Sequence, residues 1–409
     1  MATTRRALLG ASAAAPFLPR AGRAQARPVR LGVLNDQSGP YRDTGGMYSV
    51  NCVRQAVADF QAAGGDLGVP IEVIFADHQN KPDVAVGIVR QWFDRGGVDI
   101  VLDVPTSSVA LAVNTVVREK NKAYVNTGAG TTELTGKQCS PNTIHWSYDT
   151  WMLAQSTGGA TVRSGGKTWF FVTADYVFGQ QLQRDTAAFV TQNGGKVLGS
   201  AAYPFPGTTD FSSFLVSAQS SGAKVLGFAN AGADTVNCIK QAGEFGLTQS
   251  MRLAALLLFI QDVHGLGLQA AQGLVLTESF YWDLNDRTRA FAKRFQARMP
   301  GKMPNMTNAG AYAGALHYLK TVKAMGAAAA QADGAATVAR MKAMPTDDDA
   351  FGPARIREDG LVLLPVFLFE VKKPGESKGP WDYYTLLATT PPDKAWKPLK
   401  DEGCPLVRS

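Results

Sequence analysis

The feature that most constrains the fold of this chain is a regular alternation of short apolar runs with segments of helical periodicity. Alternation of this kind, with short turns between the elements, is typical of a parallel sheet covered by helices. In the first third of the chain the predicted strands are 29–34, 71–77, 99–104 and 123–126, and the predicted helices are 47–63, 83–95 and 108–120.

The same alternation restarts after Tyr148 and predicts a second α/β half. A helical block and two further strands then follow, and these do not easily form a third domain, so we expect the helices to join the first half and the strands the second. The predicted strands are 168–173, 196–203, 224–229, 253–259, 273–280, 366–371 and 381–387; the helices are 151–162, 178–192, 211–220, 235–245, 286–298, 308–325 and 335–344; and 351–364 is irregular or hairpin-like.

The predicted fold is therefore α/β, with two doubly wound parallel-sheet lobes joined by three hinge crossovers. A length of 409 residues also exceeds what one ordinary core holds. We expect crossovers near 146–149, 279–283 and 345–352. The predicted units are a leader at 1–26, lobe 1 at 27–147 plus 281–347, lobe 2 at 148–280 plus 348–390, and a C-terminal tail at 391–409.

The first 26 residues predict an export signal. Arg5 and Arg6 resemble a twin-arginine motif, an Ala-rich apolar region follows, and an A-x-A cleavage site ends at Ala26. We expect cleavage after Ala26 and a location in the periplasm. The formal charge of +7 includes four arginines of this leader and no acid, which leaves 7 − 4 = +3 for the rest. No basic stripe is present, so nucleic-acid binding is not expected.

Four cysteines remain in a chain predicted to enter an oxidising compartment. Cys139 and Cys404 both lie in loop-like sequence near proline, and we predict that they form a disulfide. Cys52 and Cys238 lie in helical segments among apolar neighbours and are predicted to be buried thiols. Four cysteines allow three pairings, and their spacing does not indicate a metal site.

Similar small, polar loops follow several predicted strands, and the stretch 123–135 is the clearest of them. Ligands of open parallel sheets bind outside the carboxyl ends of the strands, where hydroxyls and free backbone N–H groups can hold a carboxylate. Each loop has a plainer interpretation as a turn or a helix cap. The candidate loops are 37–44, 106–108 and 127–131 in the first half and 175–178, 230–234 and 280–282 in the second.

Motifs for catalysis are absent from the sequence. It contains no H-E-x-x-H or G-x-x-x-x-G-K-[ST], and its four histidines are scattered without a serine or cysteine partner by motif. We therefore expect a protein that is not an enzyme and that needs no cofactor or metal.

Several of these loops resemble those of the type I periplasmic binding proteins, in particular the branched-chain amino-acid (Leu/Ile/Val) group that feeds ABC importers. The order and spacing of the motifs carry the resemblance over nearly all of the mature chain. They are Ser38-Gly39-Pro40-Tyr41, Asp77 before a helix, Pro105 to Ala110, Gly128 to Thr135, Phe205 to Ser212 and Lys240-Gln241-Ala242.

The resemblance implies a monomer whose two lobes close over one small-molecule ligand, a carboxylate, and which delivers it to an ABC permease. It implies that 106–108 and 128–131 hold the carboxylate, that 41–44 flank it, and that second-lobe loops close over its other end. The residues implied are Tyr41, Thr44, Thr106, Ser107, Ser108, Gly128, Ala129, Gly130, Thr131, Tyr148, Trp151, Tyr176, Phe178, Asn230, Gly232, Tyr281 and Trp282.

One departure from the family pattern bears on the ligand. Amino-acid binders of this family place an acid after the strand equivalent to 253–259, whereas here the sequence continues with apolar residues to Gln261, with Asp262 the nearest acid. Phe178 and Gly232 also stand where tyrosines are expected. An aromatic or apolar organic acid is therefore favoured over an amino acid. A sensory receptor for small amides or acids, and an exported α/β hydrolase, are the alternatives.

Overall fold

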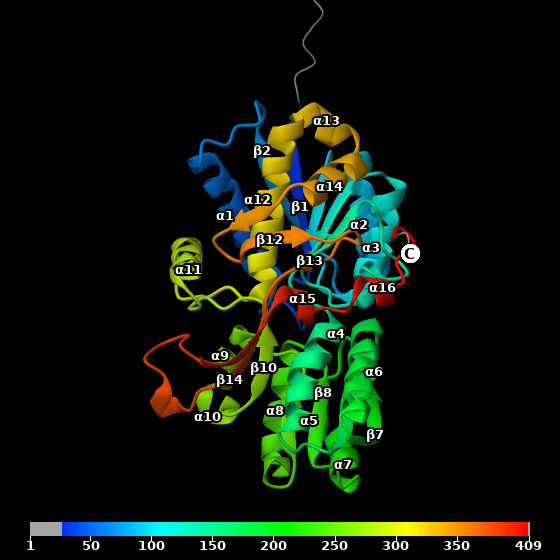
Figure 1. Cartoon of the computed structure of the whole chain (residues 1–409), viewed down its shortest axis with the longest axis vertical. Coiled ribbons are helices and arrows are strands. Elements are labelled where there is room, and N and C mark those ends of the chain that lie inside the picture. Colours follow the sequence, from blue (N-terminus) through cyan, green and yellow to red (C-terminus); the bar gives the residue numbers. More distant parts are fainter. Residues whose placement is uncertain (1–26, 408–409) are drawn as a thin grey trace, which may run out of the picture.

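Both predicted parallel sheets are present in the computed structural model, which describes residues 27–407 (Figure 1). The export signal predicted at 1–26 lies outside the described residues. The first sheet has the strand order β2-β1-β3-β4-β5, and β1, β3, β4 and β5 are almost entirely buried, as expected for strands covered on both faces. These strands are β1 (Val29–Asn35), β2 (Ile71–Asp77), β3 (Ile100–Asp103), β4 (Ala123–Asn126) and β5 (Thr143–His145).

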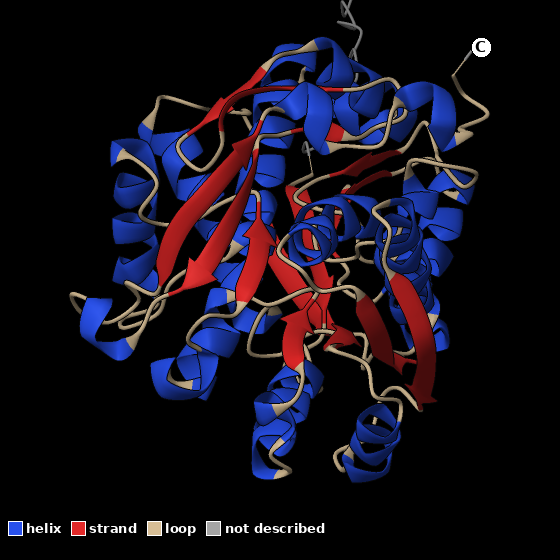
Figure 2. Ribbon diagram, turned by 60° about the horizontal axis from the view of Figure 1, so that its bottom comes forward, coloured by secondary structure: helices blue, strands red, loops and turns tan. Residues whose placement is uncertain are grey.

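The second sheet has the order β7-β6-β8-β9, again all parallel. Figure 2 shows strands in the interior of the molecule and helices around them. The strands are β6 (Thr168–Ala174), β7 (Lys196–Tyr203), β8 (Val225–Ala229) and β9 (Arg252–Ala255). The helices that accompany these two sheets are α1 (Gly46–Ala62), α2 (Pro82–Asp94), α3 (Ser107–Glu119), α4 (Thr150–Leu153), α5 (Gly159–Arg163), α6 (Val177–Gln192), α7 (Ser212–Ser220), α8 (Ala233–Glu244), α9 (Ile260–Leu266) and α10 (Leu268–Ala271).

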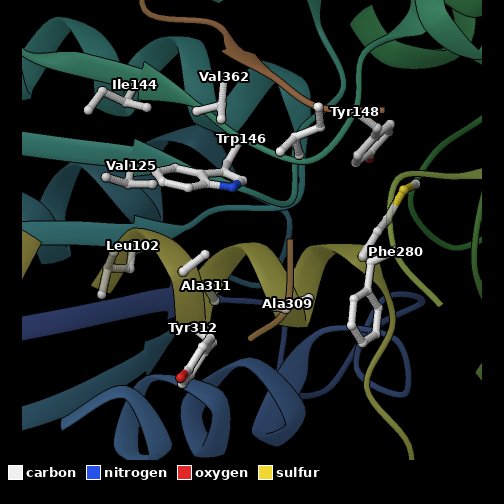
Figure 3. Close-up of a cluster of buried hydrophobic side chains, with 14 of the residues drawn as sticks. Leu102, Val125, Ile144, Trp146, Tyr148, Phe280, Ala309, Ala311, Tyr312 and Val362 are labelled. Atoms are coloured by element: carbon white, nitrogen blue, oxygen red, sulfur yellow. The ribbon is translucent and has the colours of Figure 1, made fainter. Parts of the chain in front are cut away.

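Later helices return to the first lobe, as predicted. The helix α12 (Met306–Met325) packs along α1 and against the first sheet, and it is buried from Met306 to Leu319. Close approach requires glycine here, because a Cβ on Gly314 would lie 2.6 Å from Val125. Figure 3 shows Val125 and Trp146 beside this helix. The other helices are α11 (Asp286–Arg298), α13 (Ala327–Ala332) and α14 (Gly334–Ala343).

Antiparallel strands complete the second lobe and form a small sheet on the first. The third sheet has the order β10-β14-β15, with β14 and β15 antiparallel as predicted. The small sheet has the order β11-β12-β13. Their bounds are β10 (Val275–Glu278), β11 (Thr346–Asp348), β12 (Gly352–Ile356), β13 (Val362–Leu363), β14 (Val366–Val371) and β15 (Tyr384–Thr390).

The third crossover lies near Leu364, not at 345–352 as the sequence predicts. The strands β11 and β12 contact α12 and α14, and Leu361 bridges His145 at the end of the first sheet. Leu361 and Val362 are fully buried in the same core as β1 and α12. Burial of these apolar side chains therefore places the segment 346–363 on the first lobe.

The C-terminal tail packs between the lobes and is tied to the first (Figure 1). Its short helices are α15 (Pro392–Ala395) and α16 (Leu399–Glu402). The structure contains the predicted disulfide between Cys139 and Cys404, and Cys52 and Cys238 are buried thiols. The Trp396 indole N–H donates to the carbonyl of Leu364, so the tail also holds the third crossover.

Two buried carboxyl groups lie close to the hinges. Asp149 caps α4 by accepting the N–H of Met152 at 2.7 Å, and its other oxygen has no partner among the described residues. Glu402 of the tail pairs with Arg357 at 3.1 Å. Burial raises the pKa of Asp149 to about 7 and the pKa of Glu402 to about 8. The charge of Asp185 adds to the rise at Asp149, and the charge of Asp149 adds to the rise at Glu402.

We expect Asp149 and Glu402 to lower the free energy of unfolding as pH rises from about 4 to about 8. The folded protein retains protons that the unfolded chain has already released, so stability decreases with pH by up to about 1.4 kcal/mol per pH unit for each group. The buried His78 and His145, whose pKa burial lowers to about 4, act in the opposite direction below about 6.5. Urea unfolding at several pH values measures this slope. An Asp149→Asn variant mimics the protonated side chain and should show a shallower slope; an unaltered slope would contradict the assignment.

Candidate functional site

A cavity lies between the lobes, where loops from the carboxyl ends of both parallel sheets meet. It measures about 20 Å³. Five of its lining residues are aromatic, and none of them is charged. The lining residues are Tyr41, Thr44, Gly45, Pro105, Gly128, Tyr148, Tyr176, Phe178, Ala231, Leu257, Phe259 and Thr307.

Asp36 fixes the loop that presents Tyr41. Its carboxylate accepts the backbone N–H groups of Gly39 at 2.6 Å and Tyr41 at 2.8 Å, and the side-chain amide of Asn80 at 2.8 Å. Burial raises the pKa of the Tyr41 phenol well above its usual value. The phenol therefore stays neutral and can donate a hydrogen bond.

The N-terminus of α3 is one polar corner of the site. No side chain caps its first turn, because the Thr106 hydroxyl donates instead to the side chain of Asn80. Ser107 is fully buried, and its hydroxyl has no hydrogen-bond partner in residues 27–407. Helix N-terminal N–H groups and a free hydroxyl favour an anion. Ser108, the next residue, is half-buried.

The loop of small residues after β4, 128–131, lies next to the start of α3, since a Cβ on Gly128 would lie 2.6 Å from Pro105. The Tyr148 hydroxyl donates to the carbonyl of Gly128 at 2.7 Å. A Cβ on Gly130 would lie 2.6 Å from the Tyr148 ring and 3.0 Å from the Phe178 ring. Thr131 accepts the N–H of Glu133 at 3.2 Å and so caps the following turn. The loop therefore has no room for larger side chains.

The buried Asp103 supports this loop from behind. Its carboxylate accepts hydrogen bonds from Asn35 at 2.9 Å and from Thr127 at 3.2 Å, and it lies where a Cβ on Gly128 would meet it at 2.6 Å. Burial raises the pKa of Asp103. Motif searches do not find this residue, because a lone acid at the end of a strand has no signature.

The second lobe supplies an aromatic wall. The hydroxyls of Tyr176 and Tyr41 lie 2.5 Å apart and join the lobes. Phe178 lies in the first turn of α6, which follows Tyr176, and the Phe259 ring meets the Tyr148 ring edge-on with centroids 6.4 Å apart. The backbone N–H of Ala233 also donates to the carbonyl of Pro40 at 3.0 Å across the lobes. The lobes are thus closed on one another.

Six of the residues implied by the sequence line this cavity: Tyr41, Thr44, Gly128, Tyr148, Tyr176 and Phe178. Thr106, Gly130 and Thr131 lie in the adjoining loops, and Ser107 and Ser108 are the first two residues of α3. Gly232 contacts Pro40 across the lobes, and Ala129 is buried in the core beside α3.

Four implied residues are engaged elsewhere and do not line the cavity. Trp151 packs edge-on against Phe189. The side chain of Asn230 accepts a hydrogen bond from the hydroxyl of Thr235 at 2.7 Å. Tyr281 and Trp282 both donate to the carbonyl of Trp381, at 3.1 and 2.8 Å, which turns them toward the third sheet.

Other lining residues were missed by the sequence reasoning. Leu257 and Phe259 follow β9 and occupy the region where an acid was sought. The apolar run from Leu256 could have revealed them. It continues beyond the end of β9 at Ala255 and therefore places apolar side chains in the loop. Thr307 lies in the first turn of α12 and had no comparable signal.

Residues 27–407 contain no group of three or more His, Cys, Asp or Glu side chains placed to hold a metal ion. No helix in the same range is long and apolar enough to cross a membrane.

Comparison with known proteins identifies the family. A periplasmic binding protein from Burkholderia mallei is 48% identical, covers 94% of this chain and 100% of its own, and superposes with a TM-score of 0.88. A branched-chain amino-acid ABC transporter periplasmic ligand-binding protein from Burkholderia xenovorans LB400 is 38% identical over 92% of this chain and 99% of its own, with a TM-score of 0.79.

A more distant solute-binding protein of an ABC transporter from R. palustris, solved in complex with benzoate, shares the fold. It is 22% identical over 89% of this chain and 97% of its own, with a TM-score of 0.78. The family model for periplasmic binding proteins matches residues 28–379. This chain, with its two parallel-sheet lobes and three crossovers, therefore belongs to the type I periplasmic binding proteins.

Proposed function

We propose that this protein captures a small organic acid with an aromatic or apolar body between its lobes and delivers it to an ABC importer. The observation that carries the proposal is the composition of the cavity. Five aromatic rings and no charged side chain line it, and the uncapped first turn of α3 lies beside it. Apolar walls with a few convergent polar groups are typical of small-molecule sites.

The carboxylate is assigned to the first lobe. Ser107 and the N–H groups at the start of α3 supply donors, and the loop at 128–131 approaches closely because its glycines carry no side chain. Hydrogen bonds to a carboxylate are stronger than those between neutral groups. The body of the ligand is assigned to the space among Tyr148, Phe178 and Phe259. Their rings must move apart to admit it, because the cavity of about 20 Å³ in this closed form has room for about one water.

A free amino acid is disfavoured because its ammonium group lacks a partner. The nearest second-lobe acids are already engaged. Asp234 accepts the hydroxyl of Tyr203 at 2.8 Å, and Asp262 accepts the N–H of Phe259 at 2.9 Å. The benzoate complex of the R. palustris protein supports the proposal, since a protein of this fold binds an aromatic acid there.

The remaining parts of the proposal concern the setting of the protein. It acts as a monomer in the periplasm after removal of residues 1–26, and its partner is an inner-membrane permease. It binds its ligand without turnover.

A thermal-shift screen tests the ligand class directly. Benzoate at a hundredfold excess over its dissociation constant should stabilise the protein by about 2.7 kcal/mol, and leucine should not. The screen includes aliphatic acids and amides, and a shift with leucine but not with benzoate would reverse the assignment.

We expect Ser107→Ala with Thr131→Ala to weaken benzoate binding by at least about tenfold, because hydrogen bonds to a charged group contribute about 1.5–3 kcal/mol each. Calorimetric titration measures the affinity. Ser217→Ala is the matched control, since Ser217 is exposed and bonds only within α7. Unaltered affinity in the double variant would refute the carboxylate site.

A further inference from the structure

The loop between β7 and α7 places an aromatic ring at the junction of the lobes. Phe205 stacks on Tyr176 of its own lobe, with centroids 4.3 Å apart and planes 16° from parallel. It also stacks on Tyr41 of the first lobe, with centroids 5.6 Å apart and planes at 28°. One ring thus contacts both members of the hydroxyl pair that joins the lobes.

Phe205 is outside the ligand cavity. It is absent from the cavity lining, whereas Tyr41 and Tyr176 are both part of it. Its side chain is half-buried and packs against the two tyrosines. A role in direct ligand contact is therefore not indicated.

The contact between Phe205 and Tyr41 depends on closure. Phe205 and Tyr176 belong to the same lobe, so their stacking survives when the lobes part. Tyr41 belongs to the other lobe, so its stacking on Phe205 and its hydroxyl contact with Tyr176 exist only in the closed form. Interactions present in only one of two states shift the equilibrium toward that state.

We propose that Phe205 is a positioning residue that holds the closed form through an aromatic latch, defined as Tyr41, Tyr176 and Phe205. The latch orients the two tyrosine hydroxyls at the cleft and slows release of the ligand. The kinetic part of this inference rests on the proposed function.

The expected result is a faster release in Phe205→Ala. The latch forms after the ligand has entered, so the association rate should stay the same while the dissociation rate rises about tenfold, which corresponds to about 1.4 kcal/mol. Stopped-flow fluorescence with benzoate as the probe measures both rates. Phe205→Tyr keeps the stacking ring and should restore slow release.

Phe214→Ala is the matched control. Phe214 is a half-buried ring of the same lobe that packs on Tyr203, with centroids 5.9 Å apart, and it is outside both the latch and the cavity lining. An equal rise in the dissociation rate for this variant would overturn the proposal, because the effect would then be general loosening of the lobe. An unaltered dissociation rate in Phe205→Ala would overturn it as well.

A second measurement is independent of any ligand. Spin labels at Arg118→Cys and Gln219→Cys, both exposed and on different lobes, report the interlobe distance, while Cys52 and Cys238 are buried. Phe205→Ala should lower the closed fraction of the free protein, and Phe214→Ala should not. If benzoate fails to bind, the proposed ligand class fails, and the distance distribution still decides the latch: an identical distribution in Phe205→Ala refutes it.

Discussion

We expect a Gly130→Val substitution to lower the affinity for benzoate by at least about a hundredfold, equivalent to about 2.8 kcal/mol. The reason is steric. Even a Cβ at this position would lie 2.6 Å from the Tyr148 ring and 3.0 Å from the Phe178 ring. Phe178 belongs to the second lobe and Gly130 to the first, so the added side chain occupies the space that closure needs.

The matched control for this substitution is Gly87→Ala. Gly87 lies on the exposed face of α2, and no atom outside its own helix segment lies within 4 Å of an added Cβ. Alanine there should raise stability by about 0.5–1 kcal/mol and leave binding unaltered. Calorimetric titration and circular dichroism on both variants separate binding from folding. Wild-type affinity in a folded Gly130→Val protein would show that the site lies elsewhere.

The largest expected effect on stability comes from the disulfide. Replacing Cys139 and Cys404 with serine should lower the free energy of unfolding by about 4 kcal/mol, because the bond links residues 265 apart and long loops gain most from a cross-link. The same change also frees the tail that packs on the third crossover through Trp396.

Reductant supplies the control for this prediction. Urea unfolding of the wild-type protein should become easier after reduction, whereas the double serine variant should unfold identically with and without reductant. Cys52 and Cys238 remain in both proteins, so any effect through those thiols appears in both. A fully reduced wild-type protein that retains its stability would contradict the prediction.

The parallel sheets are the part of the structure that local sequence determines best. Runs such as Val29–Asn35 are apolar on both faces and are followed by helical periodicity, so element type and order follow from the pattern. The predicted position of the third crossover, at 345–352, was wrong for a physical reason. The partner of Leu361 is His145, more than 200 residues away, and no local pattern records a contact of that range.

The residues of the candidate site also divide into those that local sequence predicts and those that depend on distant contacts. Small and hydroxyl residues after β3 and β4 predict the corner to which the carboxylate is assigned, because they offer donors and leave room for close approach. Aromatic residues carry no such information, since a ring after a strand can turn to either side. Tyr281 and Trp282 turn away because their polar atoms find the carbonyl of Trp381, about a hundred residues later in the chain.

The three crossovers have a consequence for the order in which the lobes can fold. The second parallel sheet is complete within one continuous segment, from Thr168 to Ala255, and its contacts are short in sequence. The first sheet ends at His145, yet the helix that covers its face begins only at Met306. Contacts between distant segments form slowly. We therefore expect the first lobe to fold later than the second, with one apolar face of its sheet exposed until α12 packs on it.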